Sequence, residues 1–398
     1  MSRSREHPLQ RIARASNLWI LGINSGTSLD GVDLCLLRVS ESRGRLARYD
    51  VRTTESVRFP KHLRQRLWTA ATEDTVKKQS LLQLQMDYTR WVAKSVLRIQ
   101  QRMGNSGSIH ALAFHGQTIA HYPVLKRRRR AGWNGDTTWQ IGSGPLLAQE
   151  TGLITVDDFR SSDIAAGGMG APLSGYYHYL LFGDSHAILN LGGIANVSIA
   201  RRRGQRLEVL AFDIGPGNMM IDLVAHRVLG RAFDPGGRTA QRGNPVETIL
   251  ARWRTHAYFR RTPPKTCGRE EFGATAMRQW FGRLPNRRNS AADALATAVQ
   301  GTAEQIGRAF TRWVEPFSPV RSLLLTGGGV RNAALVNALK GQLINWDVSD
   351  TSLAGVDPRF VEPAGFAVLA HETLRGRPGN LGGATGGSPA ILGSISLP

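Results

Sequence analysis

The strongest constraint on the fold is an order of elements that occurs twice along the chain. In each half, hydrophobic patterning predicts a strand, a polar glycine-rich turn, two more strands, a helix and a last strand. The first half has strands at 18–23, 32–36 and 48–59, a helix at 81–99 and a strand at 109–114. The second half has strands at 187–191, 197–200 and 207–213, a helix at 290–315 and a strand at 323–325. This repeat of order, without a repeat of residues, predicts a duplicated α/β fold whose two lobes face each other across a cleft.

The repeat also predicts the domain boundaries. We expect an N-terminal lobe over residues 18–183, an adenosine-binding C-terminal lobe over 184–375, and a tail over 376–398 that packs back on the lobes. Residues 1–17 contain four arginines and no apolar run behind them. Because a secretory signal needs such a run, we predict a disordered basic leader here.

Composition excludes several classes of protein. Of the 398 residues 41% are hydrophobic, and they are spread along the chain, which argues against a disordered protein. No apolar run approaches the roughly 18 residues of a membrane span, so no membrane association is expected. The two cysteines, Cys35 and Cys267, lie far apart, which argues against a disulfide framework or a zinc site. We therefore expect a protein of the reducing cytoplasm.

The chain is strongly basic, since 51 Lys and Arg against 30 Asp and Glu give a formal net charge of +21. Such a surface attracts anionic substrates. The basic residues nevertheless form short runs beside turn-forming residues, at 126–130, 201–203, 260–261 and 287–288. A nucleic-acid groove would need one basic stripe interleaved with aromatic residues. We therefore expect no nucleic-acid partner, and polyanion binding through these runs stays an alternative.

Three glycine-rich turns at strand ends are candidates for nucleotide binding. Glycine lets backbone N–H groups approach phosphate oxygens, and adenosine can lie flat on backbone without a Cβ. One such turn is more often structural, but three at strand ends in both halves favour a nucleotide. The candidates are Gly26, Thr27, Ser28, Leu29, Asp30, Gly31, Val32 and Asp33 in the first turn, Gly192, Gly193 and Asn196 in the second, and Gly327, Gly328 and Asn332 in the third. Of these, Asp30 or Asp33 could hold hydrated Mg²⁺, and Asp30 is the predicted ligand.

Two carboxylates occupy positions suited to catalysis. Asp213 closes a strand and precedes Gly-Pro-Gly-Asn, and Glu362 begins a helix, where the dipole favours an anion. The alternatives are a turn-capping bond for Asp213 and a helix cap for Glu362. His115 and His121 flank a turn, and the sequence shows no third metal ligand near them. We therefore interpret them as hydrogen-bonding residues rather than metal ligands.

A set of collinear motifs covers residues 18–398. The motifs are Gly26 to Asp33, His115-Gly116-Gln117-Thr118-Ile119, Gln140-Ile141-Gly142, Asp158-Phe159-Arg160 through Asp163, Gly167-Gly168 to Pro172, Asn190 to Ser198, Phe212 to Asn218, Gly268-Arg269-Glu270 and Gly327-Gly328-Gly329. With these motifs the chain resembles the anhydro-N-acetylmuramic acid kinases, sugar kinases of the actin/hexokinase/Hsp70 superfamily with a ribonuclease H-like fold. The resemblance implies a homodimer that uses ATP and Mg²⁺ to convert 1,6-anhydro-N-acetylmuramic acid and water into N-acetylmuramate 6-phosphate in peptidoglycan recycling.

The resemblance also implies roles for single residues. Asp213 is the general base, Glu362 helps to position the water and the sugar, and the Gly26–Asp33 loop takes the ATP phosphates. The implied substrate-binding residues are His115, Gln117, Thr118, Arg160, Asp163, Gly217 and Asn218. Opening the anhydro bridge needs water at C1 while O6 leaves, and a carboxylate can take the proton of that water.

The chain departs from the usual family residues at a few places. Asn24 stands for Met, Met169 for Gln, Ser161-Ser162 for an arginine-rich pair, and Cys267 for Thr or Ser. Fewer arginines near the sugar keep a levoglucosan-like 1,6-anhydro sugar as an alternative substrate. A non-catalytic nucleotide-binding protein on the same fold is the other alternative.

Overall fold

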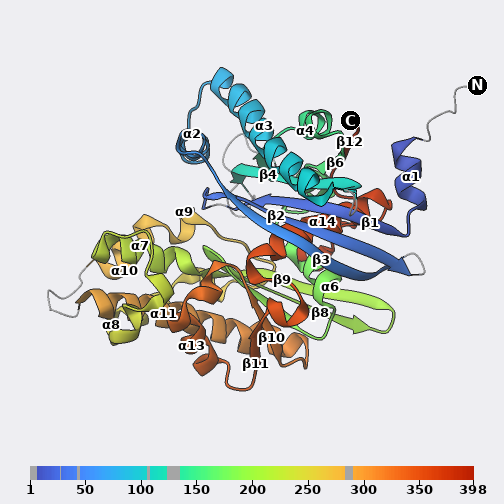
Figure 1. Cartoon of the computed structure of the whole chain (residues 1–398). Helices are drawn as coiled ribbons and strands as arrows, with labels where there is room; N and C mark the ends of the chain where they lie inside the picture. Colours follow the sequence, from blue (N-terminus) through green and yellow to red (C-terminus); the bar gives the residue numbers. More distant parts are fainter. Residues whose placement is uncertain (1–6, 27, 43–44, 105–107, 123–134, 283–289) are drawn as a thin grey trace, which may run out of the picture. The chain divides into compact units, whose positions relative to one another are not determined.

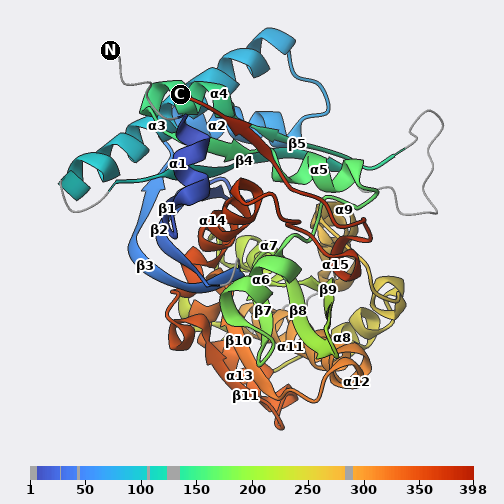
Figure 2. The ribbon, with the colours of Figure 1, turned by 90° about the vertical axis from the view of Figure 1, so that its right-hand side faces the viewer.

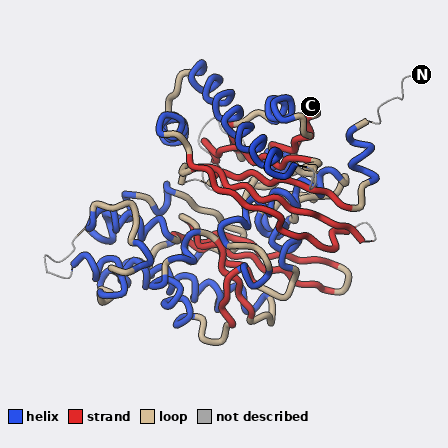
Figure 3. Tube along the Cα trace, viewed as in Figure 1, coloured by secondary structure: helices blue, strands red, loops and turns tan. Residues whose placement is uncertain are grey.

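The chain forms two compact units in a computed structural model, drawn as a ribbon in Figure 1 and by secondary structure in Figure 3. The first unit comprises Met1–Leu181 with Glu362–Pro398, and the second Phe182–Val361. The structure describes residues 7–26, 28–42, 45–104, 108–122, 135–282 and 290–398. Thr27 and the basic runs at 126–130 and 287–288 lie outside the described residues.

The first unit is built on a seven-stranded sheet with the order β12-β6-β4-β1-β2-β3, in which β5 also pairs with β4. Its strands are β1 Asn17–Ser25, β2 Gly31–Ser42, β3 Arg45–Arg58, β4 Ala111–Tyr122, β5 Thr137–Ile141, β6 Ile154–Asp157 and β12 Ser394–Ser396. Strands β1, β2 and β3 form an antiparallel meander, β4 runs parallel to β1, and β6 runs parallel to β4.

The second unit repeats this topology in a five-stranded sheet with the order β11-β10-β7-β8-β9. Its strands are β7 Ala187–Leu191, β8 Ile194–Arg203, β9 Arg206–Pro216, β10 Ser322–Thr326 and β11 Asp347–Asp350. Again the first three strands form an antiparallel meander and the last two run parallel to the first. Both sheets therefore contain the order 3-2-1-4-5 with the same strand directions, which confirms the predicted duplicated α/β fold.

Helices cover both faces of the first sheet. The helices of this unit are α1 Pro8–Arg14, α2 Lys61–Thr72, α3 Lys78–Met103, α4 Gly144–Thr151, α5 Phe159–Ala165, α6 Ser174–Phe182, α14 Val361–Leu374 and α15 Gly382–Thr385. Helices α2 and α3 bury Leu67, Tyr88 and Val92 against one face of the sheet. Helix α14 packs on the other face, and Figures 1 and 2 show it beside β1.

In the second unit, helices α7, α11 and α13 bury apolar side chains in one core with β7, β8 and β9. The helical elements are α7 Asn218–Leu229, η2 Pro235–Gly237, η3 Ala240–Arg242, α8 Glu247–Arg254, η4 Ala257–Arg260, α9 Arg269–Phe272, α10 Ala274–Phe281, α11 Ser290–Ala309, η5 Phe310–Val314, α12 Glu315–Phe317, η6 Gly328–Arg331, α13 Ala333–Gln342, η7 Thr351–Ala354 and η8 Pro358–Phe360. The predicted helix at 290–315 is present, but its last part is a π-helical turn, η5. Within the described part of the chain, no helix has the length and apolar character needed to cross a membrane.

Helix α14 belongs to the first unit, whereas the sequence assigned residues up to 375 to the second lobe. The reason is direct backbone packing on β1. A Cβ at Gly22 would lie 1.8 Å from the carbonyl oxygen of Pro363, so only glycine permits this approach. Such a contact joins residues more than 300 positions apart, and local sequence patterns carry no signal for it.

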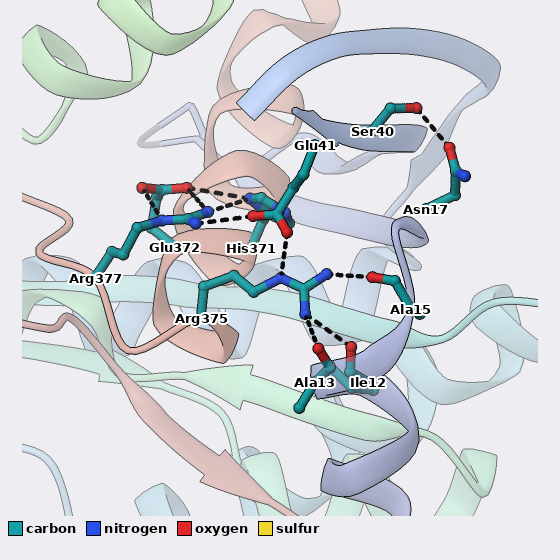
Figure 4. A network of polar contacts seen from close by, with 10 residues as sticks. All are labelled: Ile12, Ala13, Ala15, Asn17, Ser40, Glu41, His371, Glu372, Arg375 and Arg377. Carbon is teal, nitrogen blue, oxygen red and sulfur yellow. Dashed lines mark hydrogen bonds and ion pairs between the residues drawn. The ribbon is translucent and has the colours of Figure 1, made fainter. Parts of the chain in front are cut away.

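Polar side chains fix the other end of α14, as Figure 4 shows. Arg375 donates hydrogen bonds to the carbonyl oxygens of Ile12 and Ala13, both at 2.9 Å, and also to that of Ala15. The last carbonyl groups of a helix lack partners inside the helix, so a guanidinium is a suitable cap. Residues 8–14, predicted as part of a disordered leader, therefore form helix α1 and are held from the far end of the sequence.

Candidate functional site

The first candidate site lies at the end of β1, where Ser25 pairs with Gln117 of β4. The hydroxyl of Ser25 lies 2.9 Å from the carbonyl oxygen of Gly31 and also contacts the side-chain oxygen of Gln117. The Gln117 amide nitrogen donates to the carbonyl oxygen of Gly26 at 3.3 Å. The predicted substrate residue Gln117 is fully buried. In this structure the Gln117 side chain therefore supports the glycine turn through its contacts with Ser25 and Gly26.

The predicted phosphate turn divides into exposed and structural residues. Gly26, Ser28 and Asp30 are exposed and can face a ligand. Leu29 and Val32 are buried in the core of the unit, so their side chains anchor the turn and only their backbone can serve a ligand. Gly31 is needed for packing, because a Cβ there would lie 2.1 Å from the carbonyl oxygen of Val57.

Asp30, the predicted Mg²⁺ ligand, pairs with Arg64 at 3.1 Å, and both side chains are more than half exposed. Asp33 instead accepts a hydrogen bond from Ser56 on the neighbouring strand. No group of three His, Cys, Asp or Glu side chains suited to a metal occurs among the residues that the structure describes. Mg²⁺ commonly keeps several waters and binds through one or two carboxylates and phosphates, so this donor set fits a nucleotide-borne ion rather than a protein cage.

His115 and Arg160 form a buried pair near the N-terminus of α14. The His115 ring stacks on Phe366 with centroids 4.4 Å apart, and its Nε2 lies 2.9 Å from Nε of Arg160, which donates to it. Burial, with the Arg160 charge, holds the pKa of His115 well below its usual range. The ring is therefore neutral, and its Nε2 accepts the hydrogen bond from Arg160. This agrees with the interpretation of His115 as a hydrogen-bonding residue rather than a metal ligand. Arg160 also donates to the carbonyl oxygen of Gly170 at 2.7 Å.

Thr118 and His121 lie on the β4–β5 ladder. The Gln140 amide donates to Thr118 Oγ1 at 3.2 Å and to Thr138 Oγ1 at 2.8 Å. His121 Nδ1 lies 3.2 Å from the same Thr138 hydroxyl. Burial, with the Arg160 charge, lowers the pKa of His121 to about 4. Thr118 thus sits in a half-buried polar patch beside a neutral histidine.

Asp163 acts as an internal anchor. Its side chain is completely buried and accepts hydrogen bonds from Asn380 at 2.5 Å, Thr385 at 2.7 Å and the backbone of Gly170 at 2.8 Å. A Cβ at Gly168 would lie 2.2 Å from one of its oxygens. In this structure Asp163 holds the segment around Gly168 and Gly170 against the C-terminal tail, and its contact with the sugar stays a prediction.

Glu362 lies in the first turn of α14, where a helix dipole favours a carboxylate. One carboxylate oxygen accepts a hydrogen bond from the Asn24 amide at 2.5 Å. The negative charge of Glu362 acts on two neighbours. It counteracts the lowering of the Arg160 pKa by burial, and it adds to the rise that burial causes in the pKa of Tyr177. Asn24, Arg160 and Tyr177 thus surround this carboxylate within the first unit.

In the second unit, the segment 265–267 forms hydrogen bonds with both the side chain and the backbone of Asp213. Its Oδ2 accepts hydrogen bonds from the Thr266 hydroxyl at 2.7 Å and the Cys267 backbone N–H at 3.0 Å. The Asp213 backbone N–H donates to the carbonyl oxygen of Lys265 at 3.0 Å, and Tyr258 donates to the carbonyl oxygen of Asp213 at 2.7 Å. The carboxylate is therefore fixed from both its side chain and its backbone.

Lys265 and Thr266 were not singled out by the sequence. Lys265 is only 4% exposed, and its ammonium lies over the rings of Tyr258, at 4.8 Å from the centroid, and Phe212, at 5.7 Å. Burial lowers the pKa of Lys265 to about 8. The only local signal was their position directly before Cys267, one of the departures from the family residues.

A polar row crosses the second sheet at the Asp213 end. The strand register aligns Thr326 with Asn190, Asn190 with Asn196, and Asn196 with Asp213. The register between β8 and β9 shifts next to this pair, a type of β-bulge often found beside active sites. Asn196 Oδ1 is buried, and no hydrogen bond reaches it from the part of the chain that the structure describes.

The second glycine turn packs against the Gly217-Asn218 turn at the start of α7. The backbone N–H groups of Gly217 and Asn218 donate to the carbonyl oxygens of Gly193 and Gly192, each at 2.9 Å, and the Asn218 side chain donates to that of Leu191 at 2.8 Å. Asn218, predicted to bind substrate, is thus engaged within the turn. Gly193 is exposed in the turn between β7 and β8, and its carbonyl oxygen accepts the N–H groups of Gly217 and Met219 at the start of α7.

In the third turn, Gly327 has φ +83° and a Cβ there would lie 2.3 Å from Asn190 Oδ1. Gly328, by contrast, has open space where a Cβ would lie. Asn332 Oδ1 accepts from the backbone of Leu335 at 3.2 Å and caps helix α13. The cap accounts for Asn332 without a ligand, whereas the exposed Gly193, the open Gly328 and the orphaned Asn196 Oδ1 fit a bound nucleotide or its reacting partners.

The chain matches known proteins over almost its whole length. The family profile described as "Anhydro-N-acetylmuramic acid kinase" matches residues 18–398. A protein of that name from Salinibacter ruber is 35% identical over 395 residues, which cover 98% of this chain and 99% of the relative. Another from Gloeobacter violaceus is 38% identical over 383 residues, with 94% and 97% covered. Among solved structures, the activator of the 2-hydroxyisocaproyl-CoA dehydratase from Clostridium difficile has 13% identity and a TM-score of 0.44, over 90% of this chain and 96% of that one.

Proposed function

Because the chain belongs to the anhydro-N-acetylmuramic acid kinase family, we propose that it performs the reaction of that family. It is an ATP-dependent kinase of cell-wall recycling that opens 1,6-anhydro-N-acetylmuramic acid with water and phosphorylates O6, giving N-acetylmuramate 6-phosphate and ADP. The observation that carries this conclusion is the family match over residues 18–398, which includes both candidate carboxylates.

Asp213 is the general base of this proposal. It takes a proton from the attacking water while the water oxygen bonds to C1 and the C1–O6 bond breaks. The released O6 then bonds to the γ-phosphorus, and the bond to ADP breaks. Thr266 and the Cys267 backbone hold Oδ2, which fixes the orientation of the carboxylate that takes the proton. A fixed carboxylate avoids the entropic cost of orienting the base at each turnover.

Backbone donors supply most of the phosphate binding in the proposal. Gly26 and Ser28 of the first unit, and Gly193 of the second, present backbone N–H groups to phosphate oxygens. Such donors stabilise the charge that develops during phosphoryl transfer. Gly328 leaves room for adenosine.

Glu362 orients the sugar, and Asn24 keeps its carboxylate in place. Arg160, together with Thr118 on the β4–β5 ladder, contacts the sugar. Mg²⁺, when bound, offsets the negative charge of the phosphates. Asp30 stays the proposed protein ligand for it, and exchanging its ion pair with Arg64 would cost little because both side chains are exposed.

Three further features are proposals of the same kind. The chain works as a homodimer, it acts in the cytoplasm, and nucleic acid is not its partner. Cys35 and Cys267 are not joined in a disulfide, which suits a reducing compartment.

Phosphorus NMR of the purified chain with ATP and 1,6-anhydro-N-acetylmuramic acid tests the proposal. The expected result is one sugar 6-phosphate formed for each ADP, with ¹⁸O from labelled water at C1 and none in the phosphate. Levoglucosan and a reaction without sugar serve as comparisons. ADP without sugar phosphate, or faster turnover of levoglucosan, would contradict the proposed substrate.

A further inference from the structure

Asn196 has a buried side-chain oxygen with an unmet need for a hydrogen-bond donor. No donor among the described residues reaches Oδ1, although the residue as a whole is only half-buried. Leaving a buried acceptor unsatisfied is unfavourable by about 1–3 kcal/mol. Phosphate oxygens and carboxylates are acceptors and cannot meet this need, so the missing group is a hydroxyl, an amine or a water.

Asn196 lies beside the proposed base. The two residues face each other across the antiparallel pair β8–β9, where directly opposite side chains have Cβ atoms about 5 Å apart and share one face of the sheet. The register shift next to Asn196 bends the strand at this point. Asp213 itself is held through Oδ2 by Thr266 and Cys267. One water can therefore touch both side chains.

The chemistry of the proposed reaction calls for a second acceptor. An attacking water has two O–H bonds, and the base takes the hydrogen of only one. If the second O–H is also held by an acceptor, the water cannot rotate and an oxygen lone pair is directed at C1. Orienting a nucleophile in this way is among the larger contributions to enzymatic rates.

We propose that Asn196 is a further catalytic residue, whose Oδ1 accepts the second O–H of the attacking water while Asp213 takes the first. This inference rests on the proposed hydrolytic kinase reaction and gives Asn196 a role different from the phosphate contact expected from the sequence. A phosphate contact would use the amide nitrogen as donor and would change nucleotide binding. A water contact changes the rate of ring opening.

The variant Asn196→Ala separates these roles, with Ser198→Ala as the matched control. Ser198 is buried, follows two residues later on the same strand, and pairs with Ala211 rather than Asp213. For Asn196→Ala we expect kcat to fall about 10- to 100-fold, with the Kd for ATP, measured by calorimetry, unchanged within about threefold. Ser198→Ala should keep the wild-type kcat. An Asn196→Ala variant with wild-type kcat, or with its loss confined to ATP binding or to the KM for the sugar, overturns the proposal.

Methanol as a competing nucleophile provides a readout that a purely structural role would not move. Its single O–H gives a proton to Asp213, its oxygen bonds to C1, and O6 leaves and takes the phosphoryl group, which yields a methyl glycoside 6-phosphate. Because methanol has no second O–H, it gains nothing from Asn196. The ratio of methyl glycoside to free sugar phosphate should rise several-fold in Asn196→Ala, and an unchanged ratio would contradict the proposal. A wild-type chain that forms no sugar phosphate would instead refute the proposed function.

Discussion

Replacing Gly22 by alanine tests how closely the position of Glu362 depends on the packing of α14 against β1. The new Cβ would lie 1.8 Å from the carbonyl oxygen of Pro363, whereas contacts below 3.0 Å essentially never occur. The start of α14 must therefore move away by roughly 1.2 Å or more, and Glu362 is the residue next to Pro363. Its hydrogen bond from Asn24, now 2.5 Å long, would be stretched beyond normal hydrogen-bond length.

A displacement of about 1 Å in an active site can cost about 10²-fold in rate, so we expect Gly22→Ala to lower kcat by about that factor. Overpacking should also lower the free energy of unfolding by about 1–3 kcal/mol, which urea denaturation measures. Steady-state kinetics at saturating ATP and sugar is the assay. Gly341→Ala is the control, because a Cβ there meets open space within helix α13 and should leave kcat unchanged.

A folded Gly22→Ala variant with wild-type kcat would refute this reasoning. Asn24→Leu removes the same hydrogen bond without a clash, and it should lower kcat in the same direction. If Asn24→Leu is fully active, the contact between Asn24 and Glu362 does not position the carboxylate.

Three further changes probe the second unit. Thr266→Val removes one hydrogen-bond donor from Asp213 Oδ2, and we expect kcat to fall about tenfold. Thr266→Ser keeps the hydroxyl and should have the wild-type kcat. An inactive Thr266→Ser would contradict a role for the hydroxyl. Asn332→Ala removes the cap of α13; stability should fall by about 1 kcal/mol in urea titrations with an unchanged Kd for ATP, whereas weaker ATP binding would restore the nucleotide role expected from the sequence. Burial lowers the pKa of Lys265 from its ordinary 10.5 to about 8, so between these pH values the unfolded chain binds more protons than the folded chain and stability rises with pH. The stability of the wild type relative to Lys265→Met should therefore increase from pH 8 to pH 10, and a constant difference would show that the ammonium is not perturbed.

Local patterning predicts most of the strand and helix order, because the information lies in neighbouring residues. The buried apolar run 187–191 coincides with β7, and the periodic segment 81–99 lies within α3. Helix α1 was missed because only Ile12 is buried and the helix is held by Arg375, which is more than 350 residues away. The assignment of α14 to the first unit depends on the equally distant approach of Gly22 to Pro363.

The candidate site was predictable where a carboxylate follows a strand and not where its partners come from elsewhere. Asp213 could be singled out from its place before Gly-Pro-Gly-Asn. Thr266 could not, because its bond to Asp213 spans 53 residues. Asn332 shows the opposite case, since a glycine-rich turn before an Asn predicts both a ligand site and an ordinary helix cap. The structure contains the cap, and the nucleotide contact stays a prediction.

Turnover of Asp213→Asn is the most direct measurement of the central claim that this carboxylate activates the attacking water. Asparagine keeps the shape of the side chain but cannot take the proton. At saturating ATP and sugar, the account predicts a loss of kcat of about 10²- to 10⁴-fold, while calorimetry gives a Kd for ATP within about threefold of the wild type. Sugar phosphate formed at a near wild-type rate by this variant would contradict the account.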